Sequence, residues 1–139
     1  MVDSDLKAIQ DKMVEHVLDS STTIQKCGYG LNLDEKVFPY AEVLFFSGGT
    51  IDSDISHTLD RPITAQIRVY AHSADEIEYA LEILMKHWYD STRLGDLHDL
   101  GVIAINPATT FNPIKFRGDT TQPLFGDIYF VLTVRYNYT

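Results

Sequence analysis

Cysteine, basic residues and long apolar runs are all scarce in this sequence. Its single cysteine, Cys27, excludes an intrachain disulfide framework and a zinc site built from several cysteines. The 11 lysine and arginine residues are outnumbered by 20 aspartate and glutamate residues, so the formal net charge is −9. This charge argues against a protein that binds the phosphate backbone of nucleic acids or docks on an anionic membrane.

Targeting and membrane signals are equally scarce. Apolar runs such as residues 43–46 are far too short to cross a bilayer. The first residues include Asp3 and Asp5 and lack the apolar centre of a secretory signal. The 139 residues, 45% hydrophobic and 22% charged, suit one domain with a hydrophobic core. We therefore expect residues 1–139 to form a single acidic, soluble, intracellular domain.

Two segments show the period of an amphipathic helix. Apolar residues at positions 6, 9, 13 and 17 predict a helix over residues 5–18. A second helix is predicted over residues 74–90, where Ser73 and Glu76 match an N-terminal capping box. Residues 94–101 are predicted to form a turn or a short helical piece.

Two other segments alternate between apolar and polar residues, as strands do. Residues 63–72 alternate strictly, which predicts a strand with one face on the core and one face in water. Residues 127–138 also alternate between apolar and polar residues, and this segment is much longer than the usual strand of about five or six residues. We expect this strand to extend past the sheet of its own monomer and to leave edge groups for a neighbour.

Shorter strands are expected around these two. Residues 40–46 and 102–105 are rich in strand-forming residues, and residues 109–116 could pair again. Residues 24–39 predict an irregular connection with a short strand. The fold class predicted is therefore α+β, a mostly antiparallel sheet with two amphipathic helices packed on one face.

A long polar loop is predicted at about residues 47–60. A compact domain seldom carries so long a loop without a use for it. Two interpretations are open: an ordered extension of a hairpin, or a mobile arm that becomes ordered on a partner.

Acidic residues and a histidine lie close together in the polar loop, where a metal ion could bind. Asp52, Asp54, His57 and Asp60 resemble the start of a calcium-binding EF-hand loop, but the glycine and glutamate which that motif needs are absent. A solvated acidic loop is the better interpretation. No metal site is predicted.

The remaining candidates for chemistry are weak as well. His16 and His72 are interpreted as isolated surface residues, and His87 as part of a partly hydrated helix face. Cys27 has no sequence signature of a protease nucleophile around it. Residues 48–50 follow a strand like a phosphate loop but lack its lysine. No catalytic residue, no cofactor and no enzymatic activity are predicted.

The order of elements resembles that of the tail terminator, or tail-completion, proteins of tailed bacteriophages and phage-tail-like particles. The resemblance covers residues 5–138 and rests on this order. It runs through the N-terminal helix, an extended section, a strand at 38–44, a polar loop, the arginine-led strand 61–70, the serine-capped helix 73–89, residues 97–105 and the closing strand 128–138. Residues 47–60 and 106–125 do not align, and they belong to the parts expected to select partners.

This resemblance implies a structural virion protein of the phage neck. Such proteins form a ring, typically hexameric, that caps the tail tube, ends its polymerisation and supplies the docking surface for the head connector. The implied partners are further copies of the chain, the tail tube protein, a head–tail connector or head-completion protein, and a tail sheath if the tail contracts. DNA would only pass through an acidic lumen, and no membrane partner is implied. The implied location is the virion, after assembly in the host cytoplasm.

Seven residues are predicted to lie at protein interfaces. They are Asp52, Asp54 and Ile55 in the polar loop, and Arg68, Arg135, Tyr136 and Tyr138 on the two long strands. For the two arginines a second interpretation is open: they are ordinary residues of an exposed sheet face, and they pair with acids if the two strands are neighbours.

Two other functions remain open. One is a different neck or baseplate adaptor, such as a head-closure protein or a tube initiator. The other is a small cytosolic ligand-binding α+β domain.

Overall fold

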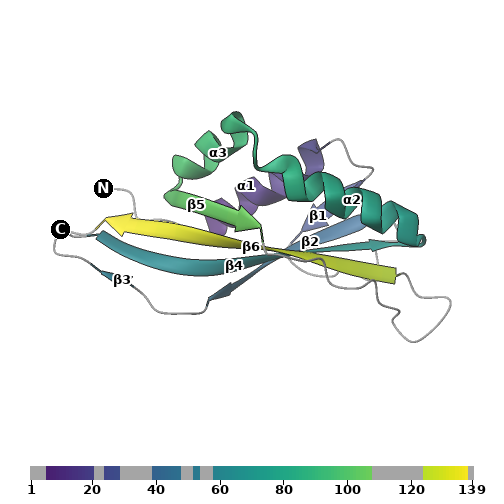
Figure 1. Ribbon diagram of the computed structural model, residues 1–139, viewed down its shortest axis with the longest axis horizontal. Coiled ribbons are helices and arrows are strands. Elements are labelled where there is room, and N and C mark those ends of the chain that lie inside the picture. Colours follow the sequence, from purple (N-terminus) through teal and green to yellow (C-terminus); the bar gives the residue numbers. More distant parts are fainter. Residues whose placement is uncertain are drawn as a thin grey trace.

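The computed structural model describes residues 6–20, 24–28, 39–47, 52–53, 58–107 and 124–137. The elements follow in the order α1 (Leu6–Asp19), β1 (Lys26–Gly28), β2 (Tyr40–Ser47), β3 (Asp52–Ser53), β4 (Thr58–Ala71), α2 (Ala74–His87), α3 (Ser91–His98), β5 (Val102–Pro107) and β6 (Leu124–Asn137). The described helices all lie on the same side of one sheet (Figure 1). The predicted α+β fold with a mostly antiparallel sheet is confirmed.

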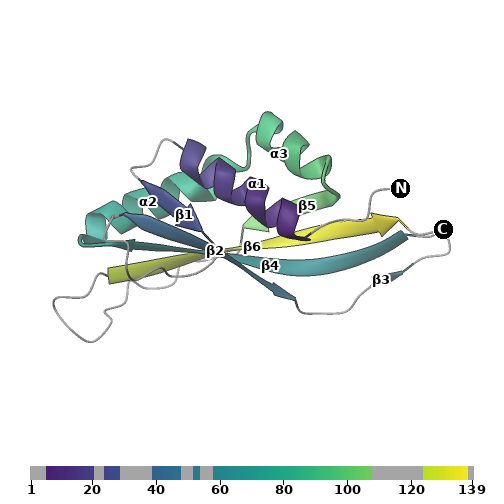
Figure 2. The same cartoon turned by 180° about the vertical axis from the view of Figure 1, so that it is seen from behind.

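The sheet is built around one long pair of strands. Its strand order is β1-β2-β4-β6-β5, with β3 also paired to β4. Strands β4 and β6 pair along their whole lengths, from Thr58 opposite Asn137 to Ala71 opposite Leu124. We call this pair the central ribbon; Figure 2 shows it from behind. Among the described pairs, only β1 with β2 is parallel.

The core lies between the helices and one face of the sheet. The alternation of β4 places Ile63, Ile67 and Val69 on that face, where each is at most 1% exposed. Helix α1 packs on β1 and β2 with one apolar stripe, which includes Met13, and α2 packs on β4 and β6 with another, which includes Leu84. Burying such side chains stabilises a fold by about 1.5–3 kcal/mol each, so these stripes fix the helices on the sheet.

The helical region departs from prediction in one respect. Helix α1 lies where it was expected, but α2 ends at His87 rather than at residue 90. The turn or short helical piece predicted at residues 94–101 is a short helix, α3, which begins earlier, at Ser91, because the carboxylate of Asp90 accepts hydrogen bonds from the backbone N–H groups of Thr92 and Arg93. This short helix joins the two amphipathic helices of the predicted fold on the same face of the sheet (Figure 1).

The predicted capping box of α2 is wrong, because its side-chain hydrogen bond is not formed. Ser73 occupies the N-cap position with an extended backbone, but its side chain makes no capping hydrogen bond. The acidic residues Asp75 and Glu76 instead lie in the first turn, where negative charge favours the helix dipole.

The predicted loop at residues 47–60 is wrong at its far end. Strand β4 begins at Thr58, because β6 reaches Asn137 and supplies it with a hydrogen-bonding partner. Asp52 and Ser53 form β3 against Asp60 and Leu59 of β4. Residues 48–51 and 54–57 lie outside the described residues, and so does the strand predicted at 109–116. Within the described parts of the chain, no helix has the length and apolar character needed to span a membrane.

Candidate interaction surface

The face of the sheet opposite the helices carries ion pairs along the central ribbon. Arg68 of β4 stands opposite Asp127 of β6, with Nε 2.7 Å from Oδ1 and Nη2 3.1 Å from Oδ2. The guanidinium also lies 4.3 Å from the centre of the Phe125 ring. The hydrogen bond to Asp127 raises the pKa of Arg68 still further, so this side chain is a permanent cation. Asp127 is 2% exposed, and a buried carboxylate needs an opposite charge beside it. Arg68 provides this charge.

A second pair lies further along the same ribbon with the charges exchanged. Arg135 of β6 stands opposite Asp60 of β4, with Nε 2.7 Å from Oδ1 and Nη2 2.8 Å from Oδ2. The two long strands are neighbours, so each arginine pairs with an acid, as the second interpretation of the sequence anticipated. Their assignment to an interface stays a prediction.

A buried hydrogen bond joins β2 to β4 on the same face. The Tyr70 hydroxyl donates to Oε1 of Glu42 at 2.6 Å, and both side chains are buried. Burial and the Glu42 hydrogen bond raise the pKa of Tyr70 to about 12. This tyrosine therefore stays protonated at neutral pH and acts as a donor that holds the strands together.

The other predicted interface residues are only partly located. Asp52 lies in β3 opposite Asp60, and Tyr136 lies on β6 opposite Leu59. Asp54, Ile55 and Tyr138 lie outside the described residues.

The edge of the sheet at β5 combines an open strand with an apolar groove. β5 pairs with β6 on one side, with an irregularity in the register at Ile103, and no described strand pairs with its other side. A groove of about 310 Å³ runs between α3 and β5. Its lining includes Leu94, 36% exposed, and Ile103, 40% exposed. We call this the β5 edge; no local pattern in the sequence marked it, because the groove forms only where α3 packs beside β5.

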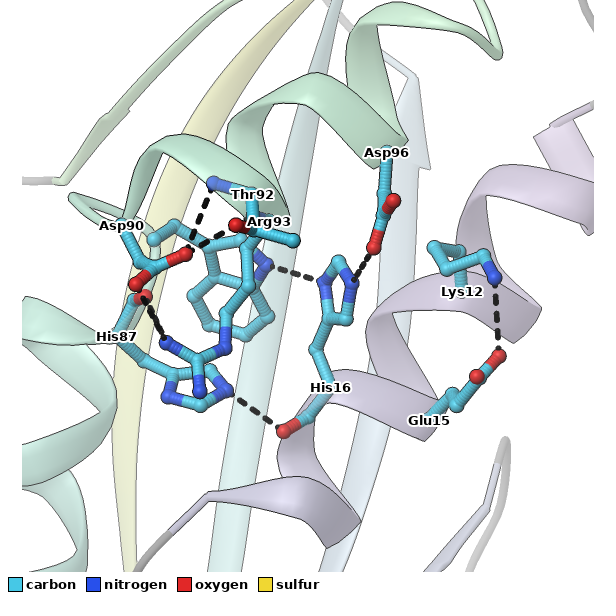
Figure 3. A network of polar contacts seen from close by, with 9 residues as sticks. Lys12, Glu15, His16, His87, Asp90, Thr92, Arg93 and Asp96 are labelled. Atoms are coloured by element: carbon cyan, nitrogen blue, oxygen red, sulfur yellow. Dashed lines mark hydrogen bonds and ion pairs between the residues drawn. The ribbon is translucent and has the colours of Figure 1, made fainter.

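A cluster of buried aromatic and imidazole side chains lies where the three helices meet (Figure 3). The indole N–H of Trp88 donates to Nδ1 of His16 at 2.9 Å, so that nitrogen carries no proton. The proton of His16 is therefore on Nε2, which lies 3.0 Å from Oδ2 of Asp96. In this arrangement both ring nitrogens of His16 have partners.

His87 completes this cluster. Its Nε2 donates to the backbone oxygen of His16 at 2.7 Å, and Arg93 donates to the backbone oxygen of His87 at 3.3 Å. Burial, and then the positive charge of Arg93, lower the pKa of His87. The imidazole of His87 is therefore neutral at pH 7.

The sequence interpretation of these histidines was wrong for two of them. His16 and His87 are buried, and only His72 of the three is exposed. A signal for His16 was available, because it lies three residues after Met13 and so falls on the apolar face of α1.

The described side chains do not gather into a cluster of metal ligands. No group of three or more histidine, cysteine or acidic residues in the described ranges could hold a metal ion. Next to the His16–Asp96 pair stands the indole of Trp88, which is not a nucleophile. Burial raises the pKa of Cys27 to about 12, so its thiol is protonated at neutral pH.

Comparison with known proteins adds one partial similarity. No protein-family model matches the chain. Over 66 residues, 48% of this chain, the sequence is 35% identical to the DNA repair and recombination protein RadA of Haloferax volcanii. The chain spans about 19% of the length of that protein. The similarity therefore does not place this chain in a family.

Proposed function

We propose that this protein is a ring-forming structural component of a phage neck, a tail terminator that caps the tail tube and receives the head connector. The observation that carries the proposal is the β5 edge, where an open strand lies beside an apolar groove with Leu94 and Ile103 exposed. Exposed strand edges pair with other chains unless they are blocked or covered. A protein that assembles into a ring has a use for such an edge.

The asymmetry of the sheet favours a ring over a two-fold dimer. β5 forms one end of the strand order and the short β1 forms the other. A contact between two unlike surfaces repeats from copy to copy and generates a closed ring when the rotation closes. The central ribbon supplies a stiff frame that fixes the distance between these ends. The acidic charge of the chain suits a lumen through which DNA passes without binding.

The first test is the mass of the protein in solution, measured by light scattering over a concentration series. We expect a hexamer. Ile103→Asp should shift the assembly toward monomers, because it places a charge in the apolar β5 edge. Tyr79→Asp is the matched control, because Tyr79 is 53% exposed on α2 and does not line the groove. Circular dichroism checks that both variants fold.

The second test separates a terminator from another adaptor. Added to polymerising tail tubes, a terminator shortens them and is seen at one end by electron microscopy. An adaptor binds without changing tube length. A tight dimer that persists at every concentration would contradict the ring and favour the small ligand-binding domain.

The similarity to RadA supports a second candidate, a DNA-associated function. It is tested by fluorescence anisotropy with single- and double-stranded DNA at low and high salt. With a net charge of −9 we expect no binding. Salt-sensitive binding would favour this candidate over the neck protein.

A further inference from the structure

The position of α3 depends on contacts with the other helices. It has eight residues, and only Leu97 among them is buried. A helix of this length is not stable alone in water. Two of its polar contacts end in the cluster of Figure 3: Asp96 bonds the ring of His16, and Arg93 bonds the backbone oxygen of His87.

Protonation of His87 would act on the second of these contacts, because the charge of Arg93 acts on the His87 ring. The neutral ring uses Nε2–H to reach the backbone oxygen of His16, and a second proton would place a cation in a site that is 6% exposed. That cation would lie beside the guanidinium of Arg93, which is itself fixed on α3. Both burial and like charge therefore favour separation of His87 from α3 once it is protonated.

His16 responds differently to a proton. A proton on its Nδ1 would face the indole N–H of Trp88 and break that hydrogen bond, but the positive ring would attract Asp96. These effects on His16 oppose each other. On His87 the two largest effects, burial and the charge of Arg93, both disfavour the proton, and they outweigh the hydrogen bond to the His16 backbone oxygen, which favours it. The protonation of His87 therefore decides whether the contacts of the cluster with α3 are kept.

The charged groups near this cluster come from α1, from α3 and from the N-cap of α3. The described ones are Lys12, Glu15, Asp19, Asp90, Arg93 and Asp96. Asp90 favours the protonated form of His87, but it contributes less than burial and Arg93 do. The sheet contributes an apolar neighbour, the ring of Phe130, which packs edge to face against Trp88 at 5.1 Å.

We propose that His87, His16, Trp88, Arg93 and Asp96 form a proton-operated latch. When His87 is neutral, the latch holds α3 against the C-terminal end of α2 and keeps the groove between α3 and β5 intact. When His87 takes up a proton, α3 separates from the end of α2 and the groove loses one wall. This latch is a property of the single chain and does not depend on the neck function.

The test uses the single tryptophan of the chain, Trp88, as a reporter inside the latch. Its fluorescence is followed from about pH 8 to about pH 5, the range in which histidines titrate. We expect one transition with a midpoint below the ordinary histidine value of 6.5. Hydrogen exchange should show about tenfold or greater loss of protection in α3, with β4 and β6 still protected.

Three variants identify the group responsible. His87→Gln keeps a side-chain N–H for the oxygen of His16 but cannot be protonated, so the transition should disappear. Arg93→Gln removes the neighbouring positive charge, so the midpoint should move to higher pH. His72→Gln is the control, because His72 is exposed, lies outside α3 and the cluster, and does not line the groove, so it should leave the transition unchanged.

Several results would overturn the latch. They are Trp88 emission that stays constant over the range, a transition that survives in His87→Gln, and strands β4 and β6 that lose protection together with α3. If His87→Gln does not fold, NMR of the His87 ring in the unmodified protein decides. A ring that titrates together with the Trp88 signal supports the latch, and a ring that stays neutral through the transition excludes it.

Discussion

Arg68 and Asp127 stand opposite each other across β4 and β6, and the Nε of the arginine lies 2.7 Å from Oδ1 of the aspartate. The same geometry recurs at Asp60 and Arg135 with the charges exchanged between the strands. A shift in the pairing of the two strands would place neither arginine opposite its acid. The two pairs therefore specify the register of the central ribbon in addition to stabilising it.

The two pairs should differ in strength. Asp127→Asn leaves the cation of Arg68 without its buried partner and should lower the free energy of unfolding by about 2–3 kcal/mol. Asp60→Asn disrupts a pair whose side chains are 27% and 41% exposed, and should cost about 1 kcal/mol or less because water screens it. Urea denaturation measures both. Equal losses would show that burial does not set the strength of these pairs.

Truncation of two adjacent residues of β6 should change the free energy of unfolding by very different amounts. Phe130 is 1% exposed and packs on Trp88, so Phe130→Ala should cost about 3–5 kcal/mol. Val131 is 41% exposed on the other face, so Val131→Ala should change the free energy of unfolding by less than about 0.5 kcal/mol. Thermal and urea unfolding test this, and a large loss at Val131 would indicate that its face is covered in the assembled protein.

The N-cap residues of α2 and α3 should also differ in how much they contribute to stability. Asp90→Ala removes two hydrogen bonds to the first turn of α3 and should lower the unfolding midpoint measurably. Ser73→Ala removes a side chain that makes no capping bond, so it should stay within about 0.5 kcal/mol of the unmodified protein. The comparison is made by thermal denaturation. A greater loss at Ser73 would reverse the assignment of the two caps.

Cys27 should be unreactive in the folded protein. Burial, and then the Glu42 carboxylate, raise its pKa to about 12, whereas an unfolded cysteine has a pKa of about 8.5. Alkylation at about pH 8.5 should therefore be at least about tenfold slower in the native protein than in urea. Similar rates in the two states would contradict the burial of the thiol.

The same shift predicts how stability changes at alkaline pH. Because the pKa of Cys27 is raised in the folded state, its contribution is fully present below about pH 8.5. It is lost as the pH rises from there to about 12. Cys27→Ala should remove this part of the alkaline loss, which denaturation at pH 8 and at pH 10 or so measures.

Local patterns in the sequence were enough to predict the α+β class of the fold. The alternation in β4 and the apolar stripes of α1 and α2 predicted which residues face the core, since a strand or a helix repeats its orientation every few residues. The other face of β4 was predicted to lie in water, and this is wrong for Gln66 and Tyr70, which are buried. The pairing of Arg68 and Arg135 with acids was also anticipated, on the condition that the two strands are neighbours. The core-facing positions depend on spacing along the chain, so the sequence alone determined them, whereas the pairing of the arginines also required β4 and β6 to be neighbours.

Long-range packing decided the rest. His16 meets Trp88 at a separation of 72 residues, and no local pattern marks either as a partner of the other. Helix α3 and the β5 edge likewise follow from what Asp90, Asp96 and Leu97 contact once the chain is folded. Burial and hydrogen bonding depend on which segments meet, and only the tertiary structure brings those segments together.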